Sequence, residues 1–510
     1  MRPLMPDRWR FDYRPSPALP PLAWVARVGN RVVTVDCGPA VRREAGGFFE
    51  GTWVGPSGLS SVAGSTTPFG TGMVVAGDDL LAIPPGHTLG LVFTTTSGTE
   101  MLVANTLVGL LASAGSELLA GVDYGSLFAR VADGLAFTPT ELPTSGSPVA
   151  FHFYENLRVL PGGRLEQVAK AREAPFTSFR DYVERLDAAL ASALVNAPGY
   201  PPVVALSNGY DSPAVAIIAA RRGCRTALTF QRARPPVWTR DTSDSGEHFG
   251  RALGMDVRFF DRDAYLRRDD LPEAEFLACG YTGEEVVLSA MEGELRHTAL
   301  LTGGLGGAMW LRGKEPHTDL RRHDFSACSM TEFRLRLDLI DLPISLMGMT
   351  ALPSLVALAN SPEMHPYSVG GYYDKPVPRR IIEEAGFERG TFATSKRAAT
   401  ALIHRFGEAA LAPATLASVR AFAATEGRGI DLSPRRRRSR LERGMQRLAH
   451  RLHLRPLERW LVRRDRAIVR HRPEAGAILL RWAVASIRSR YDAIRPARTT
   501  GGSGRARRPA

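Results

Sequence analysis

The feature that most constrains the fold is an alternation of short apolar runs with amphipathic stretches, from about residue 177 to residue 400. Its clearest unit is "VVALSNGYDSPAVAIIAARRG" (203–223), in which one apolar run turns through small polar residues into a second run closed by Gly223. Strands that alternate with helices predict a parallel sheet covered on both faces. We therefore expect an α/β fold with a doubly wound parallel sheet in this part of the chain.

The same pattern sets the expected elements and boundaries. It predicts strands at 203–207, 226–230, 257–260 and 298–303, helices at 178–196 and 212–222, and a helical region from about 273 to 297. Residues 1–160 show short β-like runs between Gly, Pro and Ser turns, with one helix-like piece at 105–115, which is typical of an α+β domain. Residues 401–434 are rich in alanine and predict helix. We expect three parts: 1–175, 176–434 and 435–510.

The charge is unevenly distributed. The chain carries a net charge of +13, but residues 435–510 hold 23 Arg and 5 acids, so the remaining residues are mildly acidic. Apolar positions at helical spacing predict that this Arg-rich tail is helical, with a disordered end after a last stripe at Leu480, Val484, Ile487, Tyr491 and Ile494. Such a tail could cover the protein, or contact an anionic partner such as a membrane surface or RNA.

Cysteine usage and hydropathy bear on the compartment. The four cysteines form no CxxC pair, which fits a reducing cytoplasm and gives no sign of a metal cluster. The opening residues lack the apolar region of a secretory signal. The longest apolar window, 340–359, contains Asp341 and two prolines, which argues for buried core and against a transmembrane segment.

The turn Ser-Asn-Gly-Tyr-Asp-Ser (207–212) stands where parallel sheets bind ligands, beyond the carboxyl end of a strand and at the start of a helix. Small residues there let backbone amides cradle phosphates, and Ser207 and Ser212 add hydroxyls. Asp211 adds a carboxylate that can hold Mg²⁺. The residues also suit a plain helix start, with Asp211 or Ser212 as the N-cap and Pro213 in the first turn. The residues alone leave both interpretations open.

"LSNGYDS" resembles the pyrophosphate-loop (PP-loop) signature Ser-Gly-Gly-x-Asp-Ser of the asparagine-synthase-like ATP pyrophosphatases, with Asn208 where that family usually has glycine. The resemblance implies a PP-loop domain of the HUP-like kind. It also implies binding of the pyrophosphate of ATP by the loop residues Ser207, Asn208, Gly209, Asp211 and Ser212.

The resemblance continues in order along the chain. "TALTF" (226–230), which contains Thr229, is similar to the strand whose backbone reads adenine. "ALLTGGLGGAMW" (299–310), which contains Gly303, lies where the family has Ser-Gly-Glu-Gly-x-Asp-Glu. Gly307 stands at the position aligned with a Mg²⁺-binding aspartate. Metal binding would then need a substitute, for which Asp244 and Glu285 are the candidates.

A late segment adds two lysines. "KPVPR" reproduces the family's Lys-x-x-x-Arg spacing with Lys375 and Arg379, and the resemblance implies that Lys375 contacts the substrate and stabilises charge in the adenylate and at amide formation. "FATSKRA" supplies Lys396 in place of a second family lysine. Only 4 of the 65 basic residues are lysines, and two of them fall on these positions, which favours a functional role over a solvated surface.

Two acids are candidates for a general base. Glu275 in "EAEFLACGYTGEE" (273–285) is the first choice to deprotonate an attacking amine, with Glu285 in reserve. Each of them would also suit a solvated helix face. "VANTLVGLLASAG" (103–115) and "YENLRVLPGGRLEQV" (154–168) resemble pieces of an Ntn-type glutaminase domain, which would be degenerate here. Because residues 1–36 contain no cysteine and Cys37 lies within a strand-like run, we expect no glutaminase activity.

The resemblance thus implies an enzyme: a carbon–nitrogen ligase that uses ATP and Mg²⁺ to adenylate a small-molecule or peptide carboxylate for attack by an amine or ammonia. Asn208 and Gly307 also suit a non-catalytic relative that acts as a binding or scaffold protein in biosynthesis. Because related loops activate tRNA bases, an RNA-modifying PP-loop enzyme is a third candidate. The sequence does not indicate the substrate.

Overall fold

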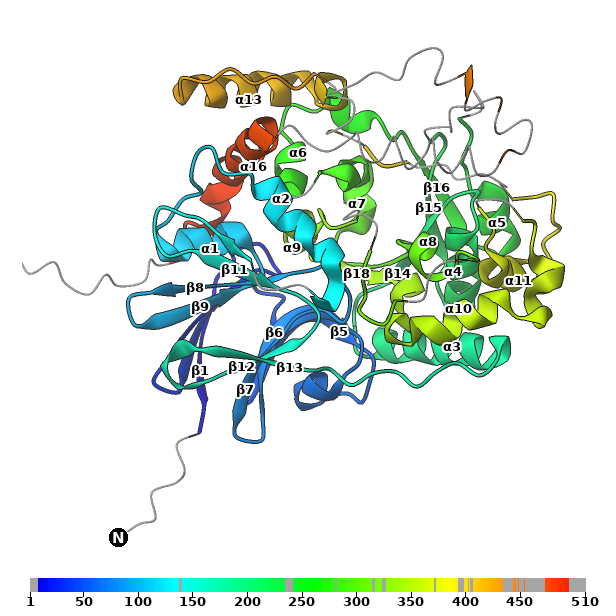
Figure 1. The fold of residues 1–510 in the computed structure, drawn as a ribbon, viewed down its shortest axis with the longest axis horizontal. Coiled ribbons are helices and arrows are strands. Elements are labelled where there is room, and N and C mark those ends of the chain that lie inside the picture. Colours follow the sequence, from blue (N-terminus) through cyan, green and yellow to red (C-terminus); the bar gives the residue numbers. More distant parts are fainter. Residues whose placement is uncertain are drawn as a thin grey trace, which may run out of the picture.

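The fold is taken from a computed structural model, which describes residues 8–494 except for 137–139, 234–241, 280–281, 314–316, 323–326, 371–372, 393–398, 402, 404–406, 434–443, 446–447, 449–453 and 455–472. Within these residues the chain is a mixed α/β protein. Figure 1 shows two parts of the fold side by side. The β-rich N-terminal half comprises residues 10–168, and the second half, from residue 179 to residue 433, has helices around a parallel sheet.

The described residues of the N-terminal half form two sheets. One has the strand order β1-β3-β2-β9-β8-β11-β10 and the other β13-β12-β7-β6-β5-β4. The first contains β1 (Arg10–Pro15), β2 (Trp24–Gly29), β3 (Val32–Cys37), β8 (Val92–Ser97), β9 (Glu100–Ala104), β10 (Glu141–Leu142) and β11 (Val149–His152). The second contains β4 (Arg42–Glu44), β5 (Gly47–Trp53), β6 (Pro68–Ala76), β7 (Asp79–Ile83), β12 (Asn156–Val159) and β13 (Leu165–Val168).

The two sheets pack against each other through alternate side chains. Val33 and Val35 of β3 share one buried cluster with Met73 of β6 and Leu80 of β7. Side chains two residues apart on a strand point to the same face, so the alternation in "VVTVD" produces this packing. The cluster also includes Cys37, whose side chain is fully buried.

Helix α1 (Leu107–Ala114) confirms the helix predicted at 105–115. The Thr106 hydroxyl accepts a hydrogen bond from the Gly109 N–H at 3.1 Å and so caps the helix. The helix ends at Gly115, whose φ of 63° is left-handed and favours glycine. The Thr106 hydroxyl also donates to Glu332 in the other half at 2.5 Å, so the cap doubles as a link between the halves.

The second half is built on a sheet of parallel strands in the order β16-β15-β14-β17-β18. The strands are β14 (Pro202–Leu206), β15 (Thr226–Phe230), β16 (Asp256–Phe260), β17 (Ala299–Thr302) and β18 (Ile340–Pro343). The predicted parallel sheet is therefore present, and the four predicted strands agree with the structure to within a few residues. β18 starts the apolar window at 340–359, which had indicated only buried core.

Helices cover both faces of this sheet. On one face, Leu206 packs near α4 (Asp211–Arg221) and α5 (Glu247–Ala252). On the other face, Val203 and Leu300 share a buried cluster with α6 (Glu273–Leu277) and α9 (Thr331–Leu337). A strand buried on both sides reads as a continuous apolar run, as β14 does. α4 and α6 therefore lie on opposite faces of the sheet.

The remaining helices agree with the sequence pattern in part. α3 (Phe179–Val195) matches the predicted helix at 178–196, and α13 (Pro413–Thr425) occupies part of 401–434. The helical region expected from about 273 to 297 is not continuous. It breaks into α6, the 3₁₀ segment η5 (Glu284–Met291) and α7 (Glu292–Leu295), and Gly283 before η5 has a left-handed φ of 66°.

The described end of the Arg-rich tail is part of the folded protein. α16 (Pro473–Ile487) packs against α2 (Tyr124–Ala129), α6 and α13, and Figure 1 shows it in red beside them. The last apolar stripe predicted from the sequence is buried throughout, at Leu480, Val484, Ile487, Tyr491 and Ile494. This segment covers the protein. Most of 434–472, and the predicted disordered end, lie outside the described residues.

A search of the described helices for a segment both long enough and apolar enough to cross a membrane finds none.

Candidate functional site

The predicted loop lies at the carboxyl end of β14, in the middle of the parallel sheet. The loop that follows β17 lies directly beside it. A side chain at Gly303 in that second loop would place its Cβ 2.8 Å from the backbone carbonyl carbon of Asp211. Because parallel strands end at the same edge, the two loops form one site where open sheets commonly bind ligands.

Hydrogen bonds within the first loop tie its two serines together. The Ser207 N–H donates to the Ser212 hydroxyl at 2.9 Å, and the two hydroxyl oxygens are 2.8 Å apart. The Asn208 N–H donates to the backbone carbonyl of Asp244 at 3.0 Å, and the Gly209 N–H donates to the Ser207 hydroxyl at 3.4 Å. These bonds hold the loop in a compact turn ahead of α4, whose first N–H groups have no acceptor within the helix.

The simpler interpretation, in which Asp211 or Ser212 caps the helix, is wrong. The N-cap position of α4 is Tyr210, and no side chain makes a capping hydrogen bond there. Asp211 is the first helical residue, and Pro213 lies in the first turn as expected. The Asp211 carboxylate is therefore directed to another partner.

That partner is Lys375. The Lys375 ammonium donates to Asp211 Oδ2, and the Lys375 side chain is only 3% exposed. Lys375 precedes α11 (Pro376–Glu384) and lies 164 residues further along the chain than Asp211. Its Nζ also lies 4.9 Å from the centre of the Tyr373 ring. The structure thus brings Lys375 into the predicted phosphate loop.

Arg379 occupies the next turn of α11 and is 1% exposed. Its guanidinium carbon lies 5.9 Å from the Tyr210 ring centre and 5.6 Å from that of Phe392, and Nη2 donates to Glu383 at 3.1 Å. Among the described atoms, Arg379 Nε and Nη1 have no hydrogen-bond partner. Such buried donors are costly unless they meet an acceptor or an aromatic face. Burial raises the pKa of the Tyr210 hydroxyl, so this residue stays neutral.

Glycines at the start of α8 (Gly306–Met309), which follows the second loop, let this segment approach Asp211 closely. A Cβ at Gly306 would lie 2.4 Å from Asp211 Cγ and 2.7 Å from Oδ2, which leaves no room for a side chain. A Cβ at Gly307 would lie 3.8 Å from Lys375 Nζ and, apart from its chain neighbours, meet no other described atom within 4 Å. Position 307, where the resemblance places a metal-binding aspartate, is therefore next to the Lys375 ammonium.

Thr229 is close to the site but is occupied structurally. Its hydroxyl is fully buried and accepts a hydrogen bond from the Gly246 N–H at 3.1 Å, just before α5. This bond fixes the carboxyl end of β15 beside the loop. Lys396, the second predicted lysine, lies outside the described residues.

The loop offers a divalent ion the carboxylate of Asp211. No group of three or more His, Cys, Asp or Glu side chains in the described part of the chain could hold an ion. Asp211 is the expected metal ligand, but its carboxylate forms an ion pair with Lys375 through Oδ2. The other carboxylate oxygen, Oδ1, and the Oδ1 of Asn208 have no hydrogen-bond partner among the described atoms. Of the two substitutes, Asp244 meets the loop through its backbone, whereas the Glu285 carboxylate is buried and accepts a hydrogen bond from Ser329.

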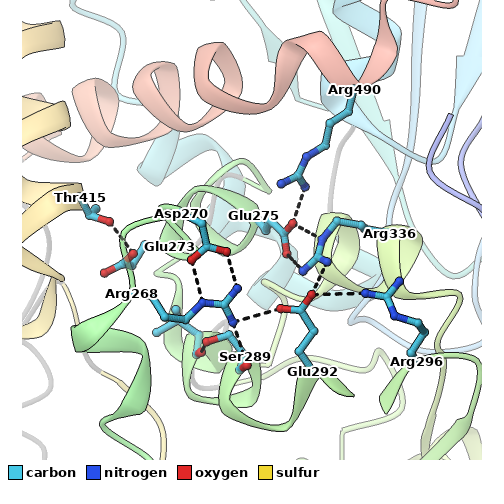
Figure 2. Close-up of polar contacts among 11 residues, drawn as sticks. Arg268, Asp270, Glu273, Glu275, Ser289, Glu292, Arg296, Arg336, Thr415 and Arg490 are labelled. Atoms are coloured by element: carbon cyan, nitrogen blue, oxygen red, sulfur yellow. Dashed lines mark hydrogen bonds and ion pairs between the residues drawn. The ribbon is translucent and has the colours of Figure 1, made fainter. Parts of the chain in front are cut away.

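The structure places Glu275, the expected base, away from this loop. Glu275 lies in α6, on the opposite face of the sheet from α4, and is 3% exposed. Its carboxylate accepts hydrogen bonds from Arg336 and from Arg490. Figure 2 shows these bonds within a larger set of alternating acidic and Arg side chains. A carboxylate engaged by two guanidinium groups supports a structural role at the joint between α6, α9 and the tail.

Sequence reasoning missed the aromatic residues of the site. The rings of Tyr210 and Tyr373 stack with their centres 5.0 Å apart, and both lie near the predicted lysine or arginine. The tyrosine within the loop and the tandem tyrosines before Lys375 were available as a signal. The close approach of Gly306 could likewise have been inferred from the repeated glycines in "GGLGG".

A comparison of the chain with protein-family models gives no match, and neither does a comparison with curated proteins.

Proposed function

We propose that this protein is an ATP-dependent ligase of the asparagine-synthase-like kind, which adenylates a carboxylate and passes the acyl group to an amine. The observation that carries the proposal is the contact between Lys375 and Asp211. Two segments that resemble the same family separately, far apart in the sequence, come together at one edge of the sheet. A buried ammonium beside a glycine-rich turn and a helix N-terminus suits a polyphosphate.

The proposed reaction has two steps. A carboxylate oxygen of the substrate attacks the α-phosphorus of ATP and pyrophosphate leaves, which yields an acyl adenylate. An amine nitrogen then attacks the acyl carbon, AMP leaves, and the amine gives up a proton. In this proposal the loop at 207–212 and Lys375 hold the departing pyrophosphate. Nε and Nη1 of Arg379, which have no hydrogen-bond partner among the described atoms, hold a second anionic group. Glu275 has no part in the proton transfer, because it is held on the other face of the sheet.

The nitrogen donor in this proposal is an amine or ammonia. Cys37, the first cysteine of the chain, is fully buried between the two N-terminal sheets, and burial raises the pKa of its thiol. A buried neutral thiol is a poor nucleophile. The N-terminal half, proposed as an Ntn-like remnant, then contributes packing rather than glutamine hydrolysis at Cys37.

The first test is calorimetric ATP binding in the presence of Mg²⁺. We expect the full chain to bind ATP, and Asp211→Ala to weaken binding by about tenfold or more, because Lys375 loses the carboxylate that positions it. Asp187→Ala is the matched control, since Asp187 also pairs with a basic residue, Arg222, but on the surface. Failure of the native chain to bind millimolar ATP would refute the proposal.

One observation favours a second candidate, a nucleotide-binding protein without chemistry: Gly307 stands where the family pattern has a carboxylate. The two candidates differ in product formation. A ligase incubated with ATP, hydroxylamine and a mixture of carboxylic acids would release pyrophosphate and form hydroxamates, because hydroxylamine captures the acyl adenylate. A binding protein would return the ATP intact.

A further inference from the structure

The charges at the loop are already balanced within the protein. Asp211 supplies one carboxylate and Lys375 supplies the ammonium that pairs with it. At the start of α8, after the second loop, Gly306 excludes any side chain by its approach to Asp211, and position 307 carries no carboxylate. A nucleotide entering this site meets a net charge close to zero from the pair.

The Lys375 ammonium lies next to position 307, where the family pattern has a metal-binding aspartate. A Cβ at position 307 would be 3.8 Å from Lys375 Nζ, so a carboxylate on that side chain would reach the space that the ammonium occupies. A divalent cation bound between positions 211 and 307 would lie within a few ångströms of Lys375. Like charges at such a distance repel strongly in a partly buried site. An ammonium and a divalent ion would therefore compete for the carboxylate of Asp211.

We propose that Lys375 takes the place of the divalent cation at this loop, so that the phosphates of the nucleotide are bound by a lysine ammonium held by Asp211, without a requirement for Mg²⁺. This inference rests on the proposed function, since it concerns how the same site binds ATP. It changes the role expected for Asp211, from metal ligand to the residue that positions Lys375. Lysine suits this role because its compact ammonium is an effective point charge toward phosphate.

The direct test measures ATP affinity of the full chain by calorimetry, once with excess Mg²⁺ and once with EDTA. An affinity in EDTA within about tenfold of that in Mg²⁺ supports the inference. A larger loss in EDTA overturns it and leaves the proposed function standing. Absence of binding under both conditions overturns the proposed function and this inference together, so the two failures are distinguishable.

A pair of variants at position 307 tests the same inference by adding the missing carboxylate. Gly307→Asp places a negative charge near Lys375, and we expect ATP affinity in EDTA to fall by about tenfold, with Mg²⁺ restoring it. Gly307→Asn is the matched control, because it adds a side chain of nearly the same size without charge and is expected to bind equally well with and without Mg²⁺. If both variants show the same metal dependence, the inference is overturned.

The variant Asp244→Asn tests whether the side chain of Asp244, whose backbone contacts the loop, binds a metal ion. If the native chain requires Mg²⁺ and this variant no longer responds to the ion, Asp244 is a metal ligand with Asp211 and the inference is overturned. If Asp244→Asn binds ATP like the native chain in EDTA and in Mg²⁺, the binding does not depend on the Asp244 carboxylate, which supports the inference.

Discussion

At the residue scale, the site depends on two glycines as much as on its charged side chains. The carboxylate of Asp211 can meet Lys375 only because Gly303 and Gly306 let the second loop lie against α4. Neither glycine is required by a left-handed φ, since neither has one. Close approach of the backbone is the reason for glycine at these two positions.

Gly306→Ala tests this close approach. The added Cβ would lie 2.4 Å from Asp211 Cγ, so we expect the carboxylate to be displaced and ATP affinity to fall by about tenfold, with a stability loss of roughly 1–3 kcal/mol from the crowding. Gly293→Ala in α7 is the control, because a Cβ there meets nothing within 4 Å. Calorimetry and thermal unfolding measure the two effects. Unchanged ATP binding in Gly306→Ala would contradict the close-packed arrangement.

How much of the site could be predicted differs from residue to residue. The serines and Asp211 lie within one turn, so their neighbourhood follows from local sequence. Lys375 could be placed there only through a resemblance. The position of Glu275 could not be predicted, because its partners Arg336 and Arg490 are 61 and 215 residues away, and no local pattern says which face of the sheet a short helix covers.

At the element scale, strands were easier to predict than helix continuity. β14 and β15 are short apolar runs bounded by turn residues, which is a strong signal. β18 was missed as a strand because it begins a long apolar window that suits any buried element. The helical region from about 273 to 297 breaks near Gly283, whose left-handed φ no helix interior accepts, and tertiary packing then decides the short pieces.

β18 also carries a group whose titration should affect stability. Asp341 lines a cavity of about 40 Å³ between the two halves, together with His87 and Arg334. Burial raises the pKa of Asp341 from 3.8 to about 7, against the lowering effect of the Arg334 guanidinium and with a further raising effect from Glu285. The folded protein therefore binds a proton here more tightly than the unfolded chain does. Its stability should fall as pH rises from about 4 to about 7.

Asp341→Asn removes this titration. We expect the variant to gain roughly 1–4 kcal/mol over the native chain at pH 8 and to gain little at pH 4, because each pKa unit corresponds to about 1.36 kcal/mol. Urea unfolding across this pH range measures the difference. Asp256→Asn, at an exposed aspartate on β16, is the matched control variant. A native chain no less stable at pH 8 than the variant would contradict the raised pKa.

At the scale of the whole molecule, the two halves and the tail are joined through buried polar contacts. Arg334 of α9 makes two hydrogen bonds to Glu50 of β5, at 2.6 and 2.8 Å. Glu332, also on α9, accepts hydrogen bonds from Thr106 of the N-terminal half and from Tyr491 of the tail, each at 2.5 Å. The apolar stripe of the tail was readable from the sequence. Its polar partners were not, because two of them, Glu275 and Glu332, lie 215 and 159 residues away along the chain.

Tyr491→Phe tests whether the tail stabilises both halves together. The substitution removes one donor to the buried Glu332 carboxylate, so we expect a loss of about 1–3 kcal/mol in the free energy of unfolding. Because Glu332 joins all three parts, hydrogen exchange should accelerate in α1 and α9 as well as in α16. Tyr13→Phe is the control, since that hydroxyl donates only to backbone carbonyls of residues 44 and 47 within the N-terminal half. Faster exchange confined to residues 473–494 would show that the tail is an appendage whose removal leaves the two halves unaffected.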